Sequence, residues 1–170
     1  MKKAAASVFV VLFLVILAGA PLCASPISIQ QWLHSTTQIT IHAHGPDSSN
    51  GLQYIKVRDS DVAGYILPNY ATHGFLSNGQ EIVAIPVGSG GSMGVNASLL
   101  FTVIGGRRRF VGYIPSPEGH LDVSIREGRL ETSTPIYGAN DPQCCPGQTK
   151  IELFTLHGLR LVKLDKRIQP

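Results

Sequence analysis

The sequence predicts a mainly β protein: one domain of about eight or nine short, mostly antiparallel strands, forming a meander, a sandwich or a barrel-like sheet. Three observations support this prediction. Apolar residues occur in short bursts, turn-forming residues separate the bursts, and no segment beyond the N-terminal apolar run has a long 3.6-residue periodicity. The 18 glycines and 11 prolines among 170 residues fit a chain with many turns.

The strands are predicted from local patterns. In residues 39–44, Ile or Ala alternates with Thr or His, which is typical of a half-buried strand. Tight turns are expected at Gly105-Gly106, Glu127-Gly128 and His157-Gly158. At most one short helix is expected outside the N-terminal segment, near Ile27–Leu33. The other strand candidates are residues 52–57, 81–87, 97–104, 108–114, 120–126, 129–134, 149–156 and 159–164.

The first 24 residues have the pattern of a secretory signal peptide. Two lysines follow Met1, residues 4–20 carry no charge, and small residues come next. We expect cleavage after Ala24, which divides the chain into a signal peptide (1–24) and an exported β domain (25–170) in the periplasm or outside the cell. An uncleaved membrane anchor and a lipoprotein modified at Cys23 are the alternatives. Either would provide the only membrane contact that the sequence suggests.

Cleavage at Ala24 removes both N-terminal lysines and changes the charge balance. The remaining 146 residues carry 12 basic and 11 acidic side chains, so the mature domain is nearly neutral. A nearly neutral domain lacks the basic surface by which proteins bind nucleic acid. Its 44% hydrophobic content, counted over the whole chain, also excludes a disordered polar chain.

The two cysteines of the mature chain are adjacent, at Cys144 and Cys145. A turn formed by Asp141, Pro142, Pro146 and Gly147 brackets them, and Pro146-Gly147 suits the centre of a type II turn. Because neighbouring Cα atoms lie about 3.8 Å apart and disulfides prefer longer spans, a bridge between them requires a twisted peptide. We expect this segment to be a rigid connector that a vicinal disulfide can cross-link. The alternative roles of the two cysteines are a redox switch, intermolecular pairing and metal binding.

Two further patterns point weakly to chemistry. Ser92 lies in a G-x-S-x-G sequence, the nucleophile elbow of α/β-hydrolases, but a strand-like segment follows it where that fold needs a helix. His42 and His44 project from one face of a strand, as two metal ligands can, but the sequence identifies no third ligand. We therefore predict no catalytic residue, no bound metal and no cofactor.

The segment Gly138–Pro146 (GANDPQCCP) resembles a G-x-x-D-P-x-C-C-P sequence of uncharacterised exported bacterial proteins. Residues 81–87, the glycine-rich link at 90–92 and residues 123–132 match the same proteins. A more distant similarity is to actinobacterial lipoproteins of the LppP/LprE type. The resemblance implies an exported β domain and supplies no catalytic residues. Residues 75–81 (FLSNGQE) depart from the aspartate-rich turn found in many such relatives.

These patterns favour a non-enzymatic exported β domain that acts as a binding or structural module in the cell envelope. The alternative is an enzyme or redox protein that uses Ser92 or the Cys144/Cys145 pair. The sequence identifies neither a ligand nor a protein partner.

Overall fold

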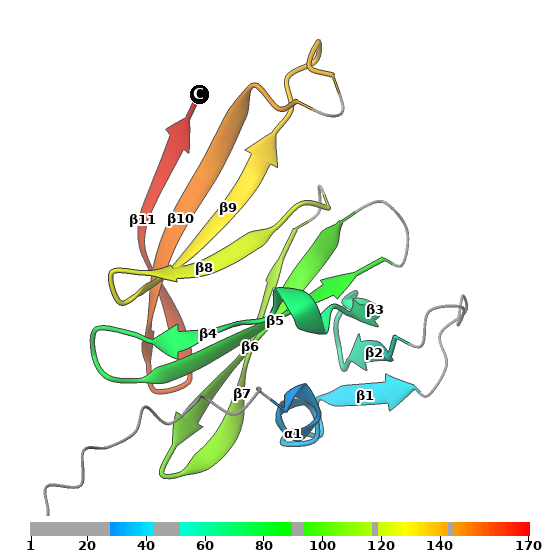
Figure 1. Cartoon of the computed structure of the whole chain (residues 1–170), viewed down its shortest axis with the longest axis vertical. Helices are drawn as coiled ribbons and strands as arrows, with labels where there is room; N and C mark the ends of the chain where they lie inside the picture. Colours follow the sequence, from blue (N-terminus) through cyan, green and yellow to red (C-terminus); the bar gives the residue numbers. More distant parts are fainter. Residues whose placement is uncertain (1–27, 43–51, 90–93, 117–118, 143–144) are drawn as a thin grey trace, which may run out of the picture.

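The structure is a computed structural model that describes residues 28–42, 52–89, 94–116, 119–142 and 145–170. These residues form eleven strands in two antiparallel sheets, with one short α-helix and one 3-10 helix (Figure 1). The prediction of a mainly β domain with one short helix is confirmed. Eleven strands exceed the predicted eight or nine.

Sheet A has the strand order β1-β2-β3-β5-β6-β7, and β4 pairs with β5 beside β3. Sheet B has the order β11-β10-β9-β8. The helices are α1 (Ile29–Leu33) and η2 (Pro68–Tyr70). The strands of sheet A are β1 (Ile39–His42), β2 (Tyr54–Val57), β3 (Ala63–Ile66), β4 (Thr72–Phe75), β5 (Glu81–Gly88), β6 (Val95–Ile104) and β7 (Arg107–Pro115). Those of sheet B are β8 (Asp122–Arg126), β9 (Arg129–Ile136), β10 (Gln148–His157) and β11 (Arg160–Gln169).

All nine predicted strand segments coincide with strands, whereas β3 and β4 were not predicted. Gly105 and Gly106 both have positive φ in the turn that joins β6 to β7, and so do Glu127 and Gly128 between β8 and β9, as two-residue hairpin turns require. The last hairpin turn is one residue later than expected. Gly158 has φ +64° and occupies the first central position, while His157 is the last residue of β10.

Strands β5 and β6 are buried on both faces and give the fold two hydrophobic cores. In β5, Val83, Ile85 and Val87 point into one core, while Ile82 and Ala84 point into the other. In β6, Leu99 and Phe101 belong to the first core and Leu100 to the second. This double burial explains why residues 82–87 are a continuous apolar run rather than an alternating one.

Sheet A curves around the first core, which also contains α1. Trp32 and Leu33 of α1 contact the same cluster as Ile39 of β1 and Phe110 of β7, from the two edges of the sheet. The Trp32 ring packs edge-to-face on Phe101 at a centroid distance of 5.9 Å, and the Arg108 guanidinium lies 5.2 Å from the Trp32 centroid. The helix therefore covers one face of sheet A.

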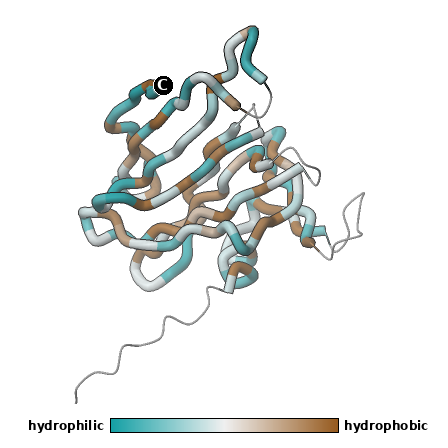
Figure 2. Tube along the Cα trace, turned by 45° about the horizontal axis from the view of Figure 1, so that its top comes forward, coloured by the Kyte–Doolittle hydropathy of each residue, from teal (hydrophilic) through white to brown (hydrophobic). Residues whose placement is uncertain are grey.

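Sheet B packs on the opposite face of sheet A and completes the second core. Leu130, Phe154 and Leu156 of sheet B join Ile82 and Leu100 there. Figure 2 shows the hydrophobic residues gathered in the central strands, with hydrophilic residues at the turns. Only one face of sheet B is used in this packing, because β8–β11 lie on the outside of the molecule (Figure 1).

The β4–β5 turn, residues 76–80, fixes the position of sheet B. The Ser77 amide donates to the Gly128 carbonyl (2.7 Å), and Asn78 Nδ2 and Gln80 Nε2 donate to the carbonyls of Leu156 (2.7 Å) and Gly158 (2.6 Å). One polar turn of sheet A thus holds both hairpin turns of sheet B. These three donors belong to residues 75–81, the segment in which this chain differs from the aspartate-rich turn of the proteins it resembles.

We predict that Gly128→Ala destabilises the protein by about 2–3 kcal/mol. Its φ of +69° disfavours a side chain, and an added Cβ would lie 2.7 Å from the Ser77 backbone nitrogen. Urea denaturation of the variant measures the loss.

Gly106→Ala is the matched control for this substitution. Gly106 has nearly the same φ, +72°, in the same type of turn, but nothing lies within 4 Å of an added Cβ. It should therefore cost only about 1 kcal/mol, the backbone penalty alone. Equal losses for the two variants would show that the contact with Ser77 contributes nothing.

Candidate functional site

The structure tests few of the residues that the sequence singled out. Ser92, His44 and Cys144 lie outside the described residues, as do Ala24 and the signal segment. His42 is exposed at the end of β1, with its ring 6.0 Å from that of Tyr54. Among the described residues, no group of three or more His, Cys, Asp or Glu side chains could hold a metal ion. No helix in the same ranges is long and apolar enough to cross a membrane.

The segment that brackets the cysteines is organised by one carboxylate. Asp141 Oδ2 accepts hydrogen bonds from the amides of Gly138 (2.7 Å) and Gly147 (2.8 Å). Two successive turns flank it, closed by Asp141 N to the Gly138 carbonyl (3.1 Å) and Cys145 N to the Pro142 carbonyl (3.0 Å). The structure of this loop therefore explains the spacing of Gly138 and Asp141 in the sequence motif and the position of Gly147 directly after it.

The loop differs in one detail from the prediction. Gly147 does not have positive φ, so it does not occupy the left-handed position of a type II turn. An added Cβ at Gly147 would instead lie 2.9 Å from Asp141 Oδ2. Glycine is therefore needed here because a side chain would collide with the carboxylate. Cys145 is exposed at the foot of the loop. The vicinal disulfide with Cys144 stays a prediction.

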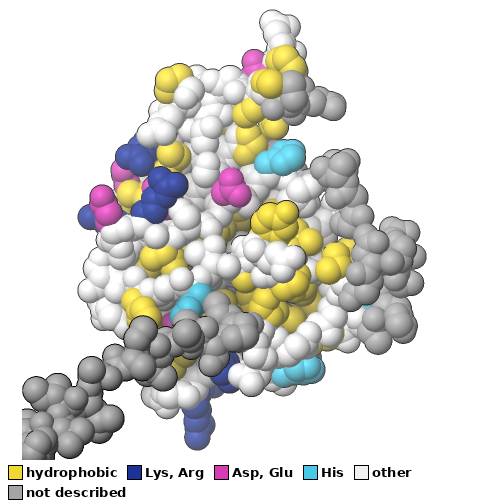
Figure 3. Space-filling model, in the orientation of Figure 1, with side chains coloured by type: hydrophobic (Ala, Val, Ile, Leu, Met, Phe, Trp, Pro, Cys, Tyr) yellow, Lys and Arg dark blue, Asp and Glu magenta, His cyan; other side chains and the backbone are white. Residues whose placement is uncertain are grey.

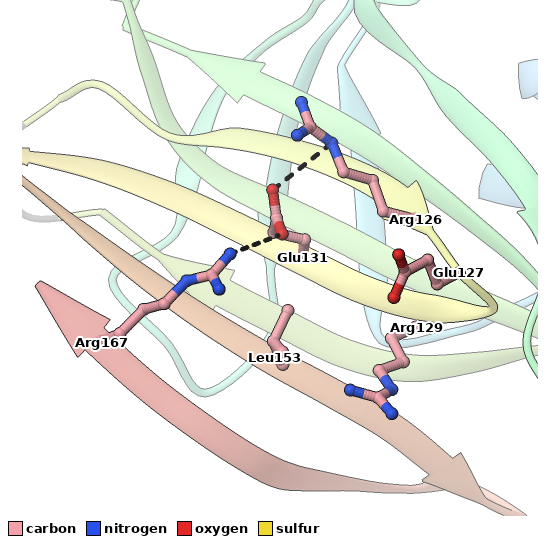
Figure 4. Close-up of a pocket in the computed structure, with 6 residues that line it drawn as sticks. All are labelled: Arg126, Glu127, Arg129, Glu131, Leu153 and Arg167. Carbon is pink, nitrogen blue, oxygen red and sulfur yellow. Dashed lines mark ion pairs between the residues drawn. The ribbon is translucent and has the colours of Figure 1, made fainter. Parts of the chain in front are cut away.

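A second set of polar residues lies on the outer face of sheet B. Arg126, Glu127, Arg129, Glu131, Leu153 and Arg167 surround a hollow of about 260 Å³, which we call the arginine hollow (Figure 4). The residues come from four strands and one turn. Arg126 ends β8, Glu127 lies in the turn, Arg129 and Glu131 begin β9, Leu153 is in β10 and Arg167 is in β11.

The strand register brings these residues to one face. Glu131 is opposite Ser124 on one side and Leu153 on the other, and Leu153 is opposite Asp165. In the next row, Ile151 is opposite Ser133 and Arg167. Side chains directly opposite one another in a sheet share a face. This face is opposite to the one that Leu130 and Phe154 present to the second core.

Glu131 is the most enclosed charged residue of the hollow. It is only 8% exposed, although no further layer of the structure covers this face. Arg126 Nε lies 3.4 Å from its Oε1, and an Arg167 terminal nitrogen lies 3.8 Å from its Oε2 (Figure 4). A buried carboxylate needs such partners because desolvation penalises its charge. Both oxygens of Glu131 are therefore already engaged.

The arginines keep unused donors. The Arg126 side chain is 71% exposed and uses only Nε toward Glu131, so its terminal nitrogens face solvent. Arg129 is exposed and forms no ion pair with any residue that the structure describes. Three guanidinium groups and two carboxylates give the hollow an excess of one positive charge at neutral pH. Figure 3 shows basic and acidic side chains side by side at the upper left of the molecule, where β10 and β11 of sheet B lie in Figure 1.

A groove of about 420 Å³ continues from the hollow, and we call it the hydroxyl groove. It shares Arg126 and Glu131 with the hollow, and Ile151 forms part of its wall. Most of its other side chains are uncharged hydrogen-bonding groups: Ser124, Ser133, Thr149 and Gln169. Asp122 adds one exposed carboxylate to the lining. A ligand with a charged end and a neutral polar remainder would meet hydrogen-bonding groups along this path.

A different charge cluster lies on the other face of sheet B. Lys163 Nζ is 2.6 Å from Glu152 Oε1, and Lys150 Nζ is 3.6 Å from Oε2. Burial raises the pKa of Glu152, but the hydrogen bond from Lys163 and the charges of both lysines outweigh it and hold the pKa below its ordinary value. This cluster joins β10 to β11 and lines neither hollow nor groove.

Sequence reasoning missed the arginine hollow, although one signal was present. Arg126 and Arg129 flank a two-residue turn and are directly opposite each other. Like charges at opposite positions destabilise a hairpin. A predicted hairpin that places two arginines together therefore indicates a local acidic partner or an anionic ligand.

Comparison of the chain with protein-family models, with curated proteins and with solved structures found no match. The chemistry of the hollow and its groove is therefore the basis for a function.

We predict that the amides of Gly138 and Gly147 report the titration of Asp141. Their hydrogen bonds, that of Gly138 first, hold its pKa below the ordinary value, because they stabilise the charged carboxylate. Since the folded pKa is depressed, the loop is stabilised above the ordinary aspartate pKa and loses this contribution as the pH falls through the folded pKa. NMR chemical shifts of both amides should follow that low pKa.

Two glycine variants separate the effects of the two amides on the pKa of Asp141. Gly147→Ala should move the Asp141 carboxylate and return its pKa toward the ordinary value. Gly138→Ala should leave the pKa low, because its Cβ would lie 3.4 Å from the carboxylate oxygens, an ordinary contact. If both variants keep the low pKa, the amide of Gly147 does not hold Asp141.

Proposed function

We propose that the chain is a non-enzymatic binding module whose arginine hollow takes the anionic group of a ligand, with the rest of the ligand in the hydroxyl groove. The observation that supports this most strongly is a difference in pairing between Glu131 and the arginines. Both oxygens of Glu131 are engaged by arginines, whereas Arg129 and the terminal nitrogens of Arg126 have no acidic partner in the described structure. Among the described residues Glu127 is unpaired as well, but the hollow keeps an excess of one positive charge, and guanidinium donors of this kind bind carboxylates and phosphates.

The floor of the hollow adds an apolar component. Leu153 lies between Arg167 and Arg129 in Figure 4, and Ile151, 8% exposed, lies in the adjoining groove. A ligand with a carboxylate or phosphate, a short apolar stretch and hydroxyl or amide groups would fit this sequence of surfaces. The hollow and the groove are both shallow and open, which suits reversible binding.

The proposal includes export of the domain. The pattern of residues 1–24 supports a periplasmic or extracellular location, and the resemblance of Gly138–Pro146 to exported bacterial proteins points the same way. In that setting the module would hold a soluble anion or an anionic group of the envelope. The proposal requires no cofactor and no nucleic acid.

Two substitutions with opposite expected effects test the anion site, with citrate as the carboxylate probe and inorganic phosphate as the second probe. Arg129→Gln should weaken binding about tenfold, because it removes a charge-assisted hydrogen bond. Glu131→Gln should strengthen binding several-fold, because it releases Arg126 and Arg167 from their internal carboxylate. Titrations followed by NMR or calorimetry measure both.

Arg107→Gln is the control, since Arg107 is an exposed arginine in another sheet. It should leave affinity unchanged, whereas added salt should weaken binding to the unmodified protein. The proposal would be contradicted if a cationic probe such as lysine bound more strongly than citrate and phosphate, and if Glu131→Gln weakened the binding of that cationic probe. This result would mean that the carboxylates are the binding groups.

A further inference from the structure

Strand β11 forms a free edge of sheet B. β10 is its only neighbour among the described strands. It is ten residues long, and residues 163–169 are exposed. Two of them are apolar: Leu164 is 49% exposed and Ile168 is 54% exposed. A long edge strand presents unpaired backbone donors and acceptors that can pair with another strand.

The middle of β11 is locally irregular. The Lys166 amide donates to Oδ1 of the neighbouring Asp165 at 2.8 Å. A β-bulge lies beside it, where the register with β10 shifts between Leu153 and Phe154.

The charge of this edge is one-sided. Four of its ten residues are basic and one is acidic. Glu152 engages Lys163, and Glu131 lies 3.8 Å from Arg167. Arg160 and Lys166 form no ion pair with any part of the chain that the structure describes. Two basic side chains of this edge are therefore unneutralised by the described residues.

We propose that β11 binds an extended acidic segment of a partner protein, which adds to sheet B as a fifth strand. Backbone hydrogen bonds would supply the pairing, as in other cases of strand addition. Arg160 and Lys166 lie on opposite faces of β11, and Ile168 shares a face with Lys166. The segment would therefore carry acidic side chains on both of its faces, toward Arg160 and Lys166, and apolar side chains that cover Leu164 and Ile168. This edge interaction is additional to anion binding in the arginine hollow, and it rests on different observations.

Charge selects this occupant over a second copy of the chain. Two β11 strands would bring together two edges that are each strongly basic, and like charges opposed across strands are destabilising. Lysines and bulges on an edge strand also discourage indiscriminate pairing. The same groups discriminate in favour of an acidic strand.

The test uses a synthetic decapeptide in which pairs of glutamates alternate with pairs of valines, so that each face of the extended peptide carries both residue types. In a control peptide, lysine replaces glutamate. The glutamate peptide should bind the full domain and slow hydrogen exchange in β11. The lysine peptide should not bind. A glutamate peptide with N-methyl groups on alternate residues should fail as well, because it cannot complete the backbone pairing.

Protein variants locate the contact. Arg160→Glu combined with Lys166→Glu should weaken binding of the glutamate peptide about tenfold or more, since it replaces opposite charges with like ones. Arg107→Glu combined with Arg109→Glu, an equal change of charge on β7, should have little effect. Arg129→Gln should also leave peptide binding intact, which separates this edge from the arginine hollow.

Three results would overturn the proposal. Equal binding of the N-methylated peptide would exclude strand addition, and an equal loss in the β7 variant would indicate unspecific attraction. Concentration-dependent dimerisation of the domain alone, abolished by the Arg160→Glu and Lys166→Glu changes, would show that the occupant is a second copy.

Discussion

The fold depends on the burial of β5 and β6 on both of their faces. Val83, Ile85 and Leu99 anchor the core around α1, while Ile82 and Leu100 anchor the core beneath sheet B. Each buried aliphatic side chain contributes about 1.5–3 kcal/mol, so this strand pair stabilises both halves together. Pro86 occurs where β5 changes partner from β4 to β3, and its carbonyl accepts from Leu67 (3.0 Å). A missing N–H is least costly at such a position.

The two faces of sheet B consequently have different surroundings. One face is committed to the second core through Leu130, Phe154 and Leu156. Among the described residues, no further layer packs on the other face, yet it holds the enclosed Glu131 and the apolar Ile151. Burial of a charged group on a face that supports no core is costly in free energy. The proposed binding role would account for that cost. The docking of the β8–β9 turn on Ser77 keeps Arg126 and Arg129 in place.

Much of the fold could be predicted from the sequence because most strands show their pattern locally. Alternation marks β1, and paired turn residues such as Glu127-Gly128 mark the hairpins. Strands β3 and β4 were missed because each has four residues and contains a glycine, so their pairing with neighbours outweighs a weak propensity. The arginine hollow could not be derived, since it requires the register of four strands. At the cysteine motif the sequence indicated a fixed loop, but only the structure identified Asp141 as the group that holds it.

Native-state hydrogen exchange across a series of low urea concentrations tests the central role of β5 and β6 most directly. If these strands join the two cores, their amides should exchange last and only through global unfolding. Amides of β8–β10 should open at a lower free energy, and those of β11 should open first. Two separate unfolding transitions, or amides of β9 and β10 that outlast those of β5 and β6, would contradict this account. Sheet B would then be an independent unit rather than a layer held by the shared strand pair.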